Sequence, residues 1–408
     1  MIGGDAFMEN GKESIDGLQD IIDLFTKGGE KFFEELGTFN LMVSGKPGVG
    51  KSTLINAVFR EDFAKTAIGE PCTQKIERYK KDGCPWTIYD TPGFELNNEA
   101  QNSIDDVKHF IQSKQSSTDE AVHCLWYCVL TESKRFEEAE KKFIDEVADL
   151  GIPVIIVLTR AYFEEDAEEL KSVIEKLRPR SKKTVIVLAE SKGRISAYGI
   201  EELMEITRQV LPEGVQRAYA NALDAKYKQA RMIKRAEAEK IIKQTQVASS
   251  AAALSPIPMS DAALLIPIEI SMMARITAVY GVDLTGHLIK TIATALASIG
   301  GASLAGRTIV SNLLKFIPGA GTAIGGAIAA ATAAALTGMI GHVYIALMEQ
   351  ICDGGMNIGE IDSDKVKDFF KSEMEKAKND AENMSGQILP LCRTESAAEG
   401  VQNNVKAD

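Results

Sequence analysis

A strand–loop–helix signature near residue 45 constrains the fold more than any other part of the chain. Its loop reads Gly45-Lys46-Pro47-Gly48-Val49-Gly50-Lys51-Ser52-Thr53, which fits the pattern G-x-x-x-x-G-K-[ST]. An apolar run over 39–44 precedes this loop, and the residues over 53–59 can form a helix. Glycines let the main chain wrap an anion with its N–H groups, and a helix N-terminus adds a favourable dipole. The signature therefore predicts an α/β unit whose first loop holds phosphate groups.

The polar residues of this loop have separate predicted roles. Lys51 is expected to reach the β- and γ-phosphates of a nucleotide, and the Ser52 hydroxyl is expected to ligate Mg²⁺. The main chain from Gly45 to Thr53 is expected to surround the phosphates. The predicted ligand is a nucleoside triphosphate with Mg²⁺.

Size and composition limit the other classes of function. The chain has 408 residues, which is more than one hydrophobic core usually serves, so several domains are expected. Its formal net charge of −12 argues against a nucleic-acid partner bound by bulk electrostatics. The six cysteines show no zinc-like pairing, and a reducing compartment, the cytoplasm, is the expected location.

Apolar and charged segments alternate from residue 39 to about residue 212. Such alternation is typical of a mostly parallel sheet wrapped by helices. Continuous apolar runs such as 154–158 predict strands that are buried on both faces. The predicted strands are 39–44, 73–80, 86–90, 124–130, 153–158 and 184–188.

The composition changes twice after this region. Residues 214–246 contain eight Lys/Arg against three Asp/Glu and read as one long, exposed, basic helix. The chain then becomes rich in Ala, Gly and Ile, which predicts an all-α hydrophobic helical domain. The predicted segments are an amphipathic helix in 1–37, an α/β nucleotide-binding domain in 38–212, a basic helical linker in 213–248, the hydrophobic helical domain in 249–350, and a charged helix with a disordered tail in 351–408.

A second motif supports the phosphate site. Asp90-Thr91-Pro92-Gly93 ends the apolar run 86–89, so the Asp90 carboxylate is placed to hold the Mg²⁺ shell. The Gly93 N–H is placed to meet the γ-phosphate. Thr73 is expected to complete the Mg²⁺ shell, because a strand-like run follows it directly, and Thr66 is its rival.

These motifs together resemble a known family. Gly45–Ser52, then Pro71-Cys72-Thr73-Gln74, then Asp90–Gly93 look like the first three G motifs of the Era/TrmE-like P-loop GTPases. The resemblance covers about residues 38–212. It implies binding of GTP and GDP with Mg²⁺, slow GTP hydrolysis, and two switch loops over 62–74 and 90–100. It assigns Lys51, Thr73 and Gly93 to catalysis.

The base-reading motif departs from the family pattern. The fourth motif, Asn/Thr-Lys-x-Asp in the family, falls on Thr159-Arg160-Ala161-Tyr162, so a tyrosine stands where an aspartate pairs with guanine. Thr159 and the stem of Arg160 are still expected to flank the base. Ala189 and Glu190 stand where the fifth motif contacts the base. The preference for GTP over ATP therefore rests on the resemblance alone.

The catalytic motif also departs from the pattern. Many small GTPases place a glutamine directly after the glycine of the third motif, and this chain has Phe94 there. Some relatives use a potassium-binding asparagine in the P-loop, where this chain has Gly48. We therefore expect slow intrinsic hydrolysis, with a water-positioning group from Glu95, from a partner or from dimerisation.

The hydrophobic region leaves three alternatives open. The segment 316–348 carries no formal charge and is longer than a membrane span requires. However, it is rich in Ala, Gly and Thr, which make its insertion into a membrane marginal. The alternatives are reversible membrane association, a wholly soluble domain, and integral insertion. Residues 250–348 resemble the YcjF-type hydrophobic domain of unknown function that follows Era-like domains.

The sequence thus predicts a GTP-binding switch coupled to a hydrophobic helical domain. The expected partners are GTP, a membrane lipid surface and a second copy of the chain through the GTP-binding domains, with no nucleic acid. The expected location is the cytoplasm, with peripheral membrane attachment. Two alternatives remain: a dynamin-like or immunity-GTPase-like membrane remodeller, and a nucleotide-binding scaffold that hydrolyses nothing.

Overall fold

The computed structural model describes residues 18–59, 76–80, 84–91, 100–253, 261–282, 286–299, 326–356 and 361–376. These residues belong to two compact units. The sheet unit comprises Glu30–Glu237 and Ala278–Val282, and the helical unit comprises Met1–Gly29, Ala238–Thr277 and Asp283–Asp408. This division differs from the predicted segments, because the chain between residues 213 and 237 belongs to the sheet unit.

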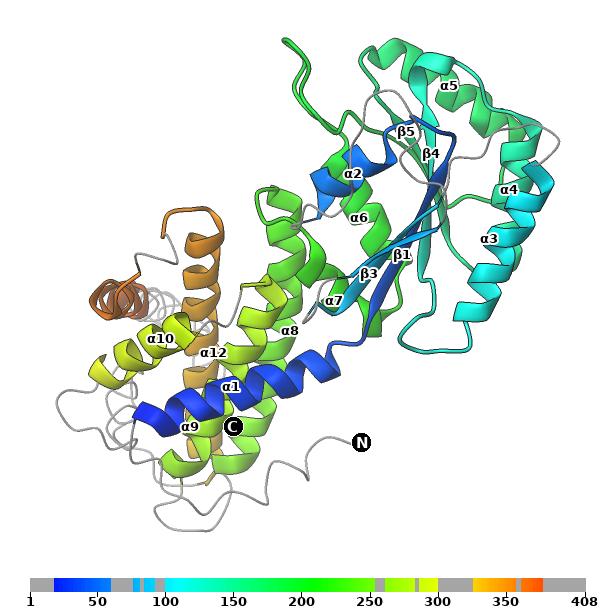
Figure 1. Cartoon of the computed structure of the whole chain (residues 1–408). Coiled ribbons are helices and arrows are strands. Elements are labelled where there is room, and N and C mark those ends of the chain that lie inside the picture. Colours follow the sequence, from blue (N-terminus) through cyan, green and yellow to red (C-terminus); the bar gives the residue numbers. More distant parts are fainter. Residues whose placement is uncertain are drawn as a thin grey trace, which may run out of the picture. The chain divides into compact units, whose positions relative to one another are not determined.

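A six-stranded sheet forms the centre of the sheet unit (Figure 1). The strands are β1 (Phe39–Gly45), β2 (Glu77–Tyr79), β3 (Trp86–Asp90), β4 (Cys124–Leu130), β5 (Val154–Thr159) and β6 (Lys183–Ile186). Their order is β2-β3-β1-β4-β5-β6, and every neighbouring pair is parallel except β2 with β3. The prediction of a mostly parallel sheet is confirmed. All residues of β1, β3 and β5 are buried, as the continuous apolar runs predict.

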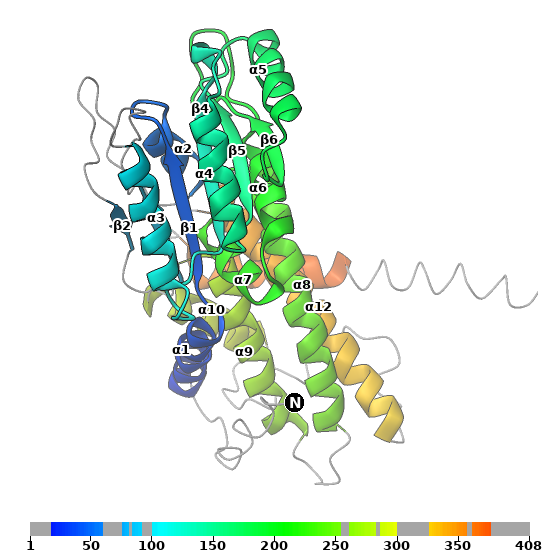
Figure 2. The same cartoon turned by 90° about the vertical axis from the view of Figure 1, so that its right-hand side faces the viewer.

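Helices cover both faces of the sheet (Figure 1; Figure 2 shows the α3–α4–α5 face). They are α2 (Lys51–Val58), α3 (Ala100–Lys114), α4 (Glu138–Asp149), α5 (Glu164–Leu177), α6 (Ile200–Val210) and α7 (Glu213–Ala222). The helix before β1, α1 (Leu18–Glu35), has residues in each of the two units. Alternate strand residues such as Leu125 and Tyr127 pack with Phe143 and Ile144 of α4 in one core. The alternation of side chains along each strand separates this core from the opposite face.

An aromatic cluster fills the opposite face of the sheet. The ring of Phe59, at the end of α2, stacks on Trp86 and on Trp126, each at a centroid distance of 5.7 Å. The Trp126 indole N–H donates to the Thr207 hydroxyl of α6 (3.0 Å), so its polar group is satisfied inside the core. This packing connects the strands that end at the predicted phosphate site with α2 and α6.

The predicted single basic helix over 214–246 is wrong. The chain forms two helices there, α7 and α8 (Lys228–Ala253), and α7 ends at Ala222, because the backbone of the next residue, Leu223, is extended. Leu223 forms an isolated antiparallel bridge with Phe59. A pairing with a residue far away in the sequence therefore replaces a turn of helix. The segment is not wholly exposed either, since Tyr219 and Lys234 are buried.

Helices alone make up the described part of the helical unit, which confirms the predicted all-α class. They are the C-terminal part of α8, most of α9 (Asp261–Tyr280), α10 (Gly286–Ile299), α12 (Gly326–Cys352) and a helix over 363–376. Small residues bring α12 close to α8, because a Cβ atom on Gly341 would lie 2.6 Å from Ile242. The Gln246 amide of α8 donates to the Ala334 carbonyl of α12 (3.0 Å).

One segment among the described residues, Ala330–Cys352, is long and apolar enough to cross a membrane, with a mean hydropathy of 1.5. However, 61% of its apolar window is buried inside the unit, as in the core helix of a soluble protein. Gly321 and Gly325, four residues apart in the sequence as in helices that pack closely, lie outside the described residues. Leu288, Ile289 and Ile292 of α10 are buried, in agreement with the helical spacing of the large apolar residues there.

A buried carboxyl group lies among the helices of this unit. Glu269 of α9 is 7% exposed, and its Oε1 accepts a hydrogen bond from the Thr337 hydroxyl of α12 (2.5 Å). The Thr337 hydroxyl also lies 2.8 Å from the Ser249 hydroxyl of α8. Burial raises the pKa of Glu269 to about 7. Three helices therefore meet at a carboxyl group whose charged form is disfavoured.

We expect Glu269→Gln to stabilise the protein at alkaline pH. A carboxyl whose pKa is higher in the folded state than in the unfolded chain contributes stability below the unfolded pKa of about 4.5, and this stability is lost as the pH rises through about 7. At 1.36 kcal/mol per pKa unit, the loss is on the order of 3 kcal/mol. Urea unfolding followed by far-UV circular dichroism at pH 5 and pH 8.5 measures it. The exposed Glu375→Gln variant should keep the wild-type pH dependence, and parallel behaviour of both variants would contradict the assignment.

Candidate functional site

The phosphate loop has the geometry that its glycines allow. It runs from the end of β1 at Gly45 to the start of α2 at Lys51. Gly50, the N-cap of α2, has φ 98° and ψ 22°, a left-handed conformation that side chains disfavour. Gly45 has φ 141°, and a Cβ atom there would clash with the Cys128 carbonyl oxygen of β4. The glycines at these two positions therefore let the loop turn while it passes close to the neighbouring strand.

The Lys51 ammonium group lies within this loop. Lys51 is 8% exposed, and its Nζ donates to the carbonyl oxygens of Gly45 (3.1 Å) and Lys46 (3.2 Å). Burial lowers the pKa of Lys51, and the nearby carboxylate of Asp90 partly opposes this effect. The loop thus holds a partly desolvated positive charge against its own carbonyl groups, at the place where the sequence predicts the terminal phosphates.

Asp90 lies at the same edge of the sheet. It ends β3, is fully buried, and is in register with Val43 of the parallel neighbour β1. The Thr91 N–H donates to the Val43 carbonyl (3.0 Å), which fixes the chain just beyond the strand. Ser52 is half-buried in the first turn of α2. Thr73, Thr66, Gly93, Phe94 and Glu95 lie outside the described residues.

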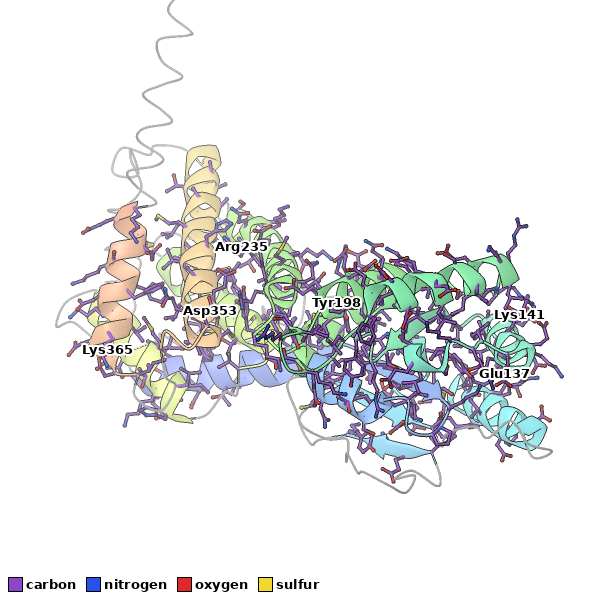
Figure 3. The ribbon with its side chains drawn as sticks, turned by 90° about the horizontal axis from the view of Figure 1, so that it is seen from above. Glu137, Lys141, Tyr198, Arg235, Asp353 and Lys365 are labelled. Carbon is purple, nitrogen blue, oxygen red and sulfur yellow. The ribbon has the colours of Figure 1, made fainter. Side chains whose placement is uncertain are left out.

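Lys46 makes contacts that sequence reasoning missed. Its ammonium group lies 2.7 Å from Glu137 Oε1 and 3.4 Å from Glu140 Oε2, at the start of α4 (Figure 3 labels Glu137). Glu140 is buried, which raises its pKa, and it accepts a hydrogen bond from the Tyr127 hydroxyl (3.2 Å). Glu140 Oε2 also accepts from the Glu137 N–H in a capping box. The Glu-x-x-Glu spacing is visible in the sequence, but its partner, 91 residues away from Glu137, is not.

Thr159 and Arg160, at the end of β5, lie close to the phosphate loop. The Thr159 hydroxyl lies 2.5 Å from the Val49 carbonyl oxygen and 3.2 Å from that of Val129, so it bridges the loop and β4. Arg160 has φ 52°, and its Nε would lie 3.7 Å from a Cβ atom on Gly50. The end of β5 is therefore joined to the loop by the Thr159 hydrogen bond, and the Arg160 side chain lies next to Gly50.

A hairpin over 188–198 follows β6 and contacts the residues that come directly after β5. Leu188 pairs with Tyr198, and the Tyr198 hydroxyl donates to the Ala161 carbonyl (2.7 Å; Figure 3 labels Tyr198). The Lys192 ammonium lies 4.1 Å from the centroid of the Tyr162 ring, a cation–π contact. Ala189 is half-buried and Glu190 is exposed. The structure thus brings the hairpin that contains Ala189 and Glu190 to the segment after Thr159 and Arg160.

The described residues contain no group of three or more His, Cys, Asp or Glu side chains arranged to hold a metal ion. A magnesium site at this edge would therefore depend on one carboxylate and on hydroxyl and phosphate oxygens. Asp90 and Ser52 are hard oxygen donors of the kind that Mg²⁺ prefers. The buried hydroxyl groups of Ser44 and Thr91 find no hydrogen-bond partner in the part of the chain that the structure describes. The donor set at this edge fits the ion.

Two family models match the chain. The model described as 50S ribosome-binding GTPase matches residues 40–190, which include the phosphate loop and the sheet. The model described as a domain of unknown function, DUF697, matches residues 218–379. The second match begins within α7 and so includes residues of the sheet unit as well as the helical unit.

Individual proteins resemble parts of this chain. GTPase Der of Malacoplasma penetrans is 27% identical over 170 residues, which are 41% of this chain and 37% of that protein. Magnetosome membrane protein 22 of Magnetospirillum gryphiswaldense is 30% identical over 141 residues, 35% of this chain and 70% of that protein. This chain thus spans well under half the length of GTPase Der. A crystal structure of a tyrosine-to-alanine variant of Aquifex aeolicus Era bound to GDP.AlF4- is 18% identical, covers 45% of this chain and 67% of its own, and has a TM-score of 0.33.

The phosphate loop, the buried carboxylate one strand away and the matched family models point to one assignment. The chain combines a P-loop GTPase domain of the 50S ribosome-binding GTPase family in residues 40–190, which is similar to Era and Der, with a YcjF-type DUF697 domain in residues 218–379.

Proposed function

We propose that this chain binds GTP with Mg²⁺, hydrolyses it slowly, and acts as a nucleotide-dependent switch for its hydrophobic helical domain. The observation that carries this proposal is the buried Lys51 ammonium inside a glycine-shaped loop, beside the buried Asp90 carboxylate. A loop of this kind stabilises a polyphosphate through main-chain N–H groups and one lysine.

The proposed roles of the residues follow from the sequence motifs to which they belong. Lys51 and the main chain of Gly45–Thr53 hold the phosphates, and Gly93 contributes an N–H to the γ-phosphate. Ser52, Thr73 and Asp90 would hold Mg²⁺, which neutralises charge on the phosphate oxygens when it is bound. Thr159, Arg160, Ala189 and Glu190 surround the base.

Slow hydrolysis is proposed because two common water-positioning groups are missing. Phe94 stands after the glycine of the third motif, and Gly48 stands in the loop position where some relatives have asparagine. Stabilising the attacking water then requires another group, from Glu95, from a partner or from a second copy of the chain. A dimer through the GTP-binding domains would bring such a group to each site.

Single-turnover GTP hydrolysis over a range of protein concentrations tests this proposal. We expect slow turnover that rises with protein concentration. Fast turnover that is independent of concentration would contradict the need for an external group. Binding of GTP without any hydrolysis, with and without liposomes, would favour the nucleotide-binding scaffold instead.

Reversible membrane association of the helical unit is the second part of the proposal. Its support is the apolar helix Ala330–Cys352 and the likeness to a protein named for the magnetosome membrane. The buried thiols of Cys124 and Cys128 suit a reducing compartment, and burial raises the pKa of Cys128 to about 12. We propose a cytoplasmic protein that attaches peripherally to a lipid surface.

Flotation of the protein with anionic liposomes, in GDP and in a non-hydrolysable GTP analogue, tests the attachment. We expect binding in one nucleotide state to exceed binding in the other, and salt to release the protein. A monomer that stays in solution in both states would contradict the proposal. Liposome-stimulated turnover with self-assembly would favour a membrane remodeller.

A further inference from the structure

The aspartate that reads guanine in related GTPases is replaced by Tyr162, so another group must read the base. Guanine presents two neighbouring donors, N1–H and N2–H₂, which a carboxylate accepts together. A phenol has one oxygen and cannot accept both in the same way. Tyr162 is also covered on one face by the Lys192 ammonium, 4.1 Å from its ring centroid. We propose, on the basis of the GTP binding proposed above, that Glu190 is the guanine-reading carboxylate of this chain.

Glu190 is the only acidic residue in the two segments at this edge, 159–163 and 188–198. The nearest carboxylates along the chain lie in the first turn of α5, at Glu164, Glu165 and Asp166. Asp166 is already paired with Lys134 of the loop after β4 (2.6 Å). Glu190 is exposed and makes no ion pair within the described residues. A free carboxylate is thus available on the hairpin and not at position 162.

The hairpin over 188–198 is attached to Ala161 and Tyr162, the residues after Arg160, by contacts on both sides of Glu190. On one strand Leu188 pairs with Tyr198, whose hydroxyl donates to the Ala161 carbonyl (2.7 Å). On the other side Lys192 contacts the Tyr162 ring, and the Ser191 hydroxyl accepts from the Ala197 N–H (3.0 Å). Glu190 therefore lies in a short segment whose backbone is held against the residues that follow Thr159. Lys192 acts here as a positioning residue for the hairpin.

This placement predicts how the site discriminates between purines. Adenine presents an unprotonated N1 where guanine has N1–H, so a carboxylate and the adenine N1 would face each other as two acceptors. Xanthine keeps N1–H but has a carbonyl oxygen in place of N2–H₂. An amide offers one acceptor and one donor, which matches xanthine and not guanine. A single exchange of oxygen for NH₂ at position 190 should therefore change the preferred base.

Glu190→Gln is expected to convert the preference from GTP to XTP. A good bidentate pair contributes about 1–3 kcal/mol of discrimination, so we expect roughly tenfold or greater loss of GTP affinity and a comparable gain for XTP. Competition titration of GTP, XTP and ATP against a fluorescent GDP analogue on the full chain measures both changes. Glu164→Gln, on the neighbouring helix, is the matched control and should keep the wild-type order GTP over XTP and ATP.

The possible results separate this inference from the function on which it rests. A wild-type chain that binds neither GTP nor ATP contradicts the proposed function. A wild-type chain that prefers GTP, with the same preference in Glu190→Gln or with the XTP switch in Glu164→Gln, contradicts the role of Glu190 alone. Equal affinity of the wild type for GTP and ATP also contradicts it, because a carboxylate reader rejects adenine.

The positioning role of Lys192 has its own readout. Lys192→Met is introduced into the wild-type chain and into the Glu190→Gln variant. It should weaken GTP binding in the first and XTP binding in the second by the same factor, because it loosens the hairpin without touching the base. The order of preference should stay unchanged in each background. Lys192→Arg should restore affinity, since a guanidinium also stacks on an aromatic ring. A variant that changes the order of preference would show that Lys192 reads the base itself.

Discussion

The Lys51→Met protein is expected to fold normally and to lose more than 100-fold in affinity for GTP. In the wild type, the Lys51 ammonium group is a buried positive charge in the phosphate loop. Its hydrogen bonds to the carbonyl oxygens of Gly45 and Lys46 hold it in place. A charge held in a partly buried site interacts with phosphate more strongly than one in water. Removal of a single charge-assisted contact of this kind costs roughly 3 kcal/mol or more, because the phosphate loses its partner and keeps its own desolvation cost.

The stability of the nucleotide-free protein should change little in the same variant. Burial lowers the pKa of Lys51, which means that its charged form is disfavoured in the fold. Methionine removes this penalty and also removes two hydrogen bonds to carbonyl oxygens, so the two effects oppose each other. We expect a change in unfolding free energy below about 1 kcal/mol.

Isothermal titration calorimetry with GTP and Mg²⁺, together with urea unfolding, measures both quantities. Lys176→Met, at an exposed position in the last turn of α5, is the matched control and should bind as the wild type does. Normal nucleotide affinity in Lys51→Met would show that the terminal phosphates lie elsewhere. A large loss of stability would show that the lysine serves the fold.

Lys234→Met is expected to destabilise the sheet unit by about 3–5 kcal/mol. The Lys234 side chain is fully buried, and its Nζ lies near four backbone carbonyl oxygens. These are Ala220 (2.5 Å), Tyr280 (3.2 Å), Asn221 (3.4 Å) and Val279 (3.4 Å). They belong to the last turns of α7 and α9, where helix carbonyls lack partners within the helix and the dipole is negative.

The size of this effect follows from what the variant leaves behind. Methionine matches the shape of lysine but donates no hydrogen bond, so carbonyl groups of two helix ends become unsatisfied in a buried place. Losing one member of a buried charged arrangement costs several kcal/mol for this reason. The Asn221 amide, which donates to the Ala278 carbonyl (2.6 Å), joins the same two helix ends and cannot replace the ammonium.

Urea unfolding followed by the fluorescence of the chain's two tryptophans reports on this unit, since Trp86 and Trp126 are both in its sheet. Lys228→Met, at an exposed position on the same helix, should unfold at the wild-type urea concentration. Equal midpoints for the two variants would mean that the carbonyl groups find water or other donors.

Local patterns predicted much of the sheet unit. The runs 39–44 and 86–90 became β1 and β3 nearly residue for residue, because a buried parallel strand needs an unbroken apolar run that ends at a turn. The phosphate loop was equally visible, since glycine is required where φ is positive, as at Gly50. The motif order predicted that Thr159 flanks the base, and the structure adds a hydrogen bond from its hydroxyl to the Val49 carbonyl of the phosphate loop.

Contacts between distant residues were beyond such patterns. Nothing near residue 223 indicates that Leu223 pairs with Phe59 and interrupts a helix. A basic, turn-poor segment favours one exposed helix, whereas Lys234 is buried because two helix ends from elsewhere in the chain need its charge. The ion pair of Lys46 with Glu137 and the contact of Lys192 with Tyr162 likewise depend on loops that only the sheet brings together.

Local residue patterns were enough to predict the strand–loop–helix, the parallel α/β class and the replacement of the guanine-reading aspartate by Tyr162. These properties depend on backbone freedom, apolar periodicity and residue identity, which act over a few neighbouring residues. The folded arrangement was needed to show where the helix after residue 213 breaks, that Lys234 is buried, and that the hairpin over 188–198 is held against the segment after Thr159. Such properties depend on the desolvation and pairing of groups that are far apart along the chain and become neighbours only when the strands align.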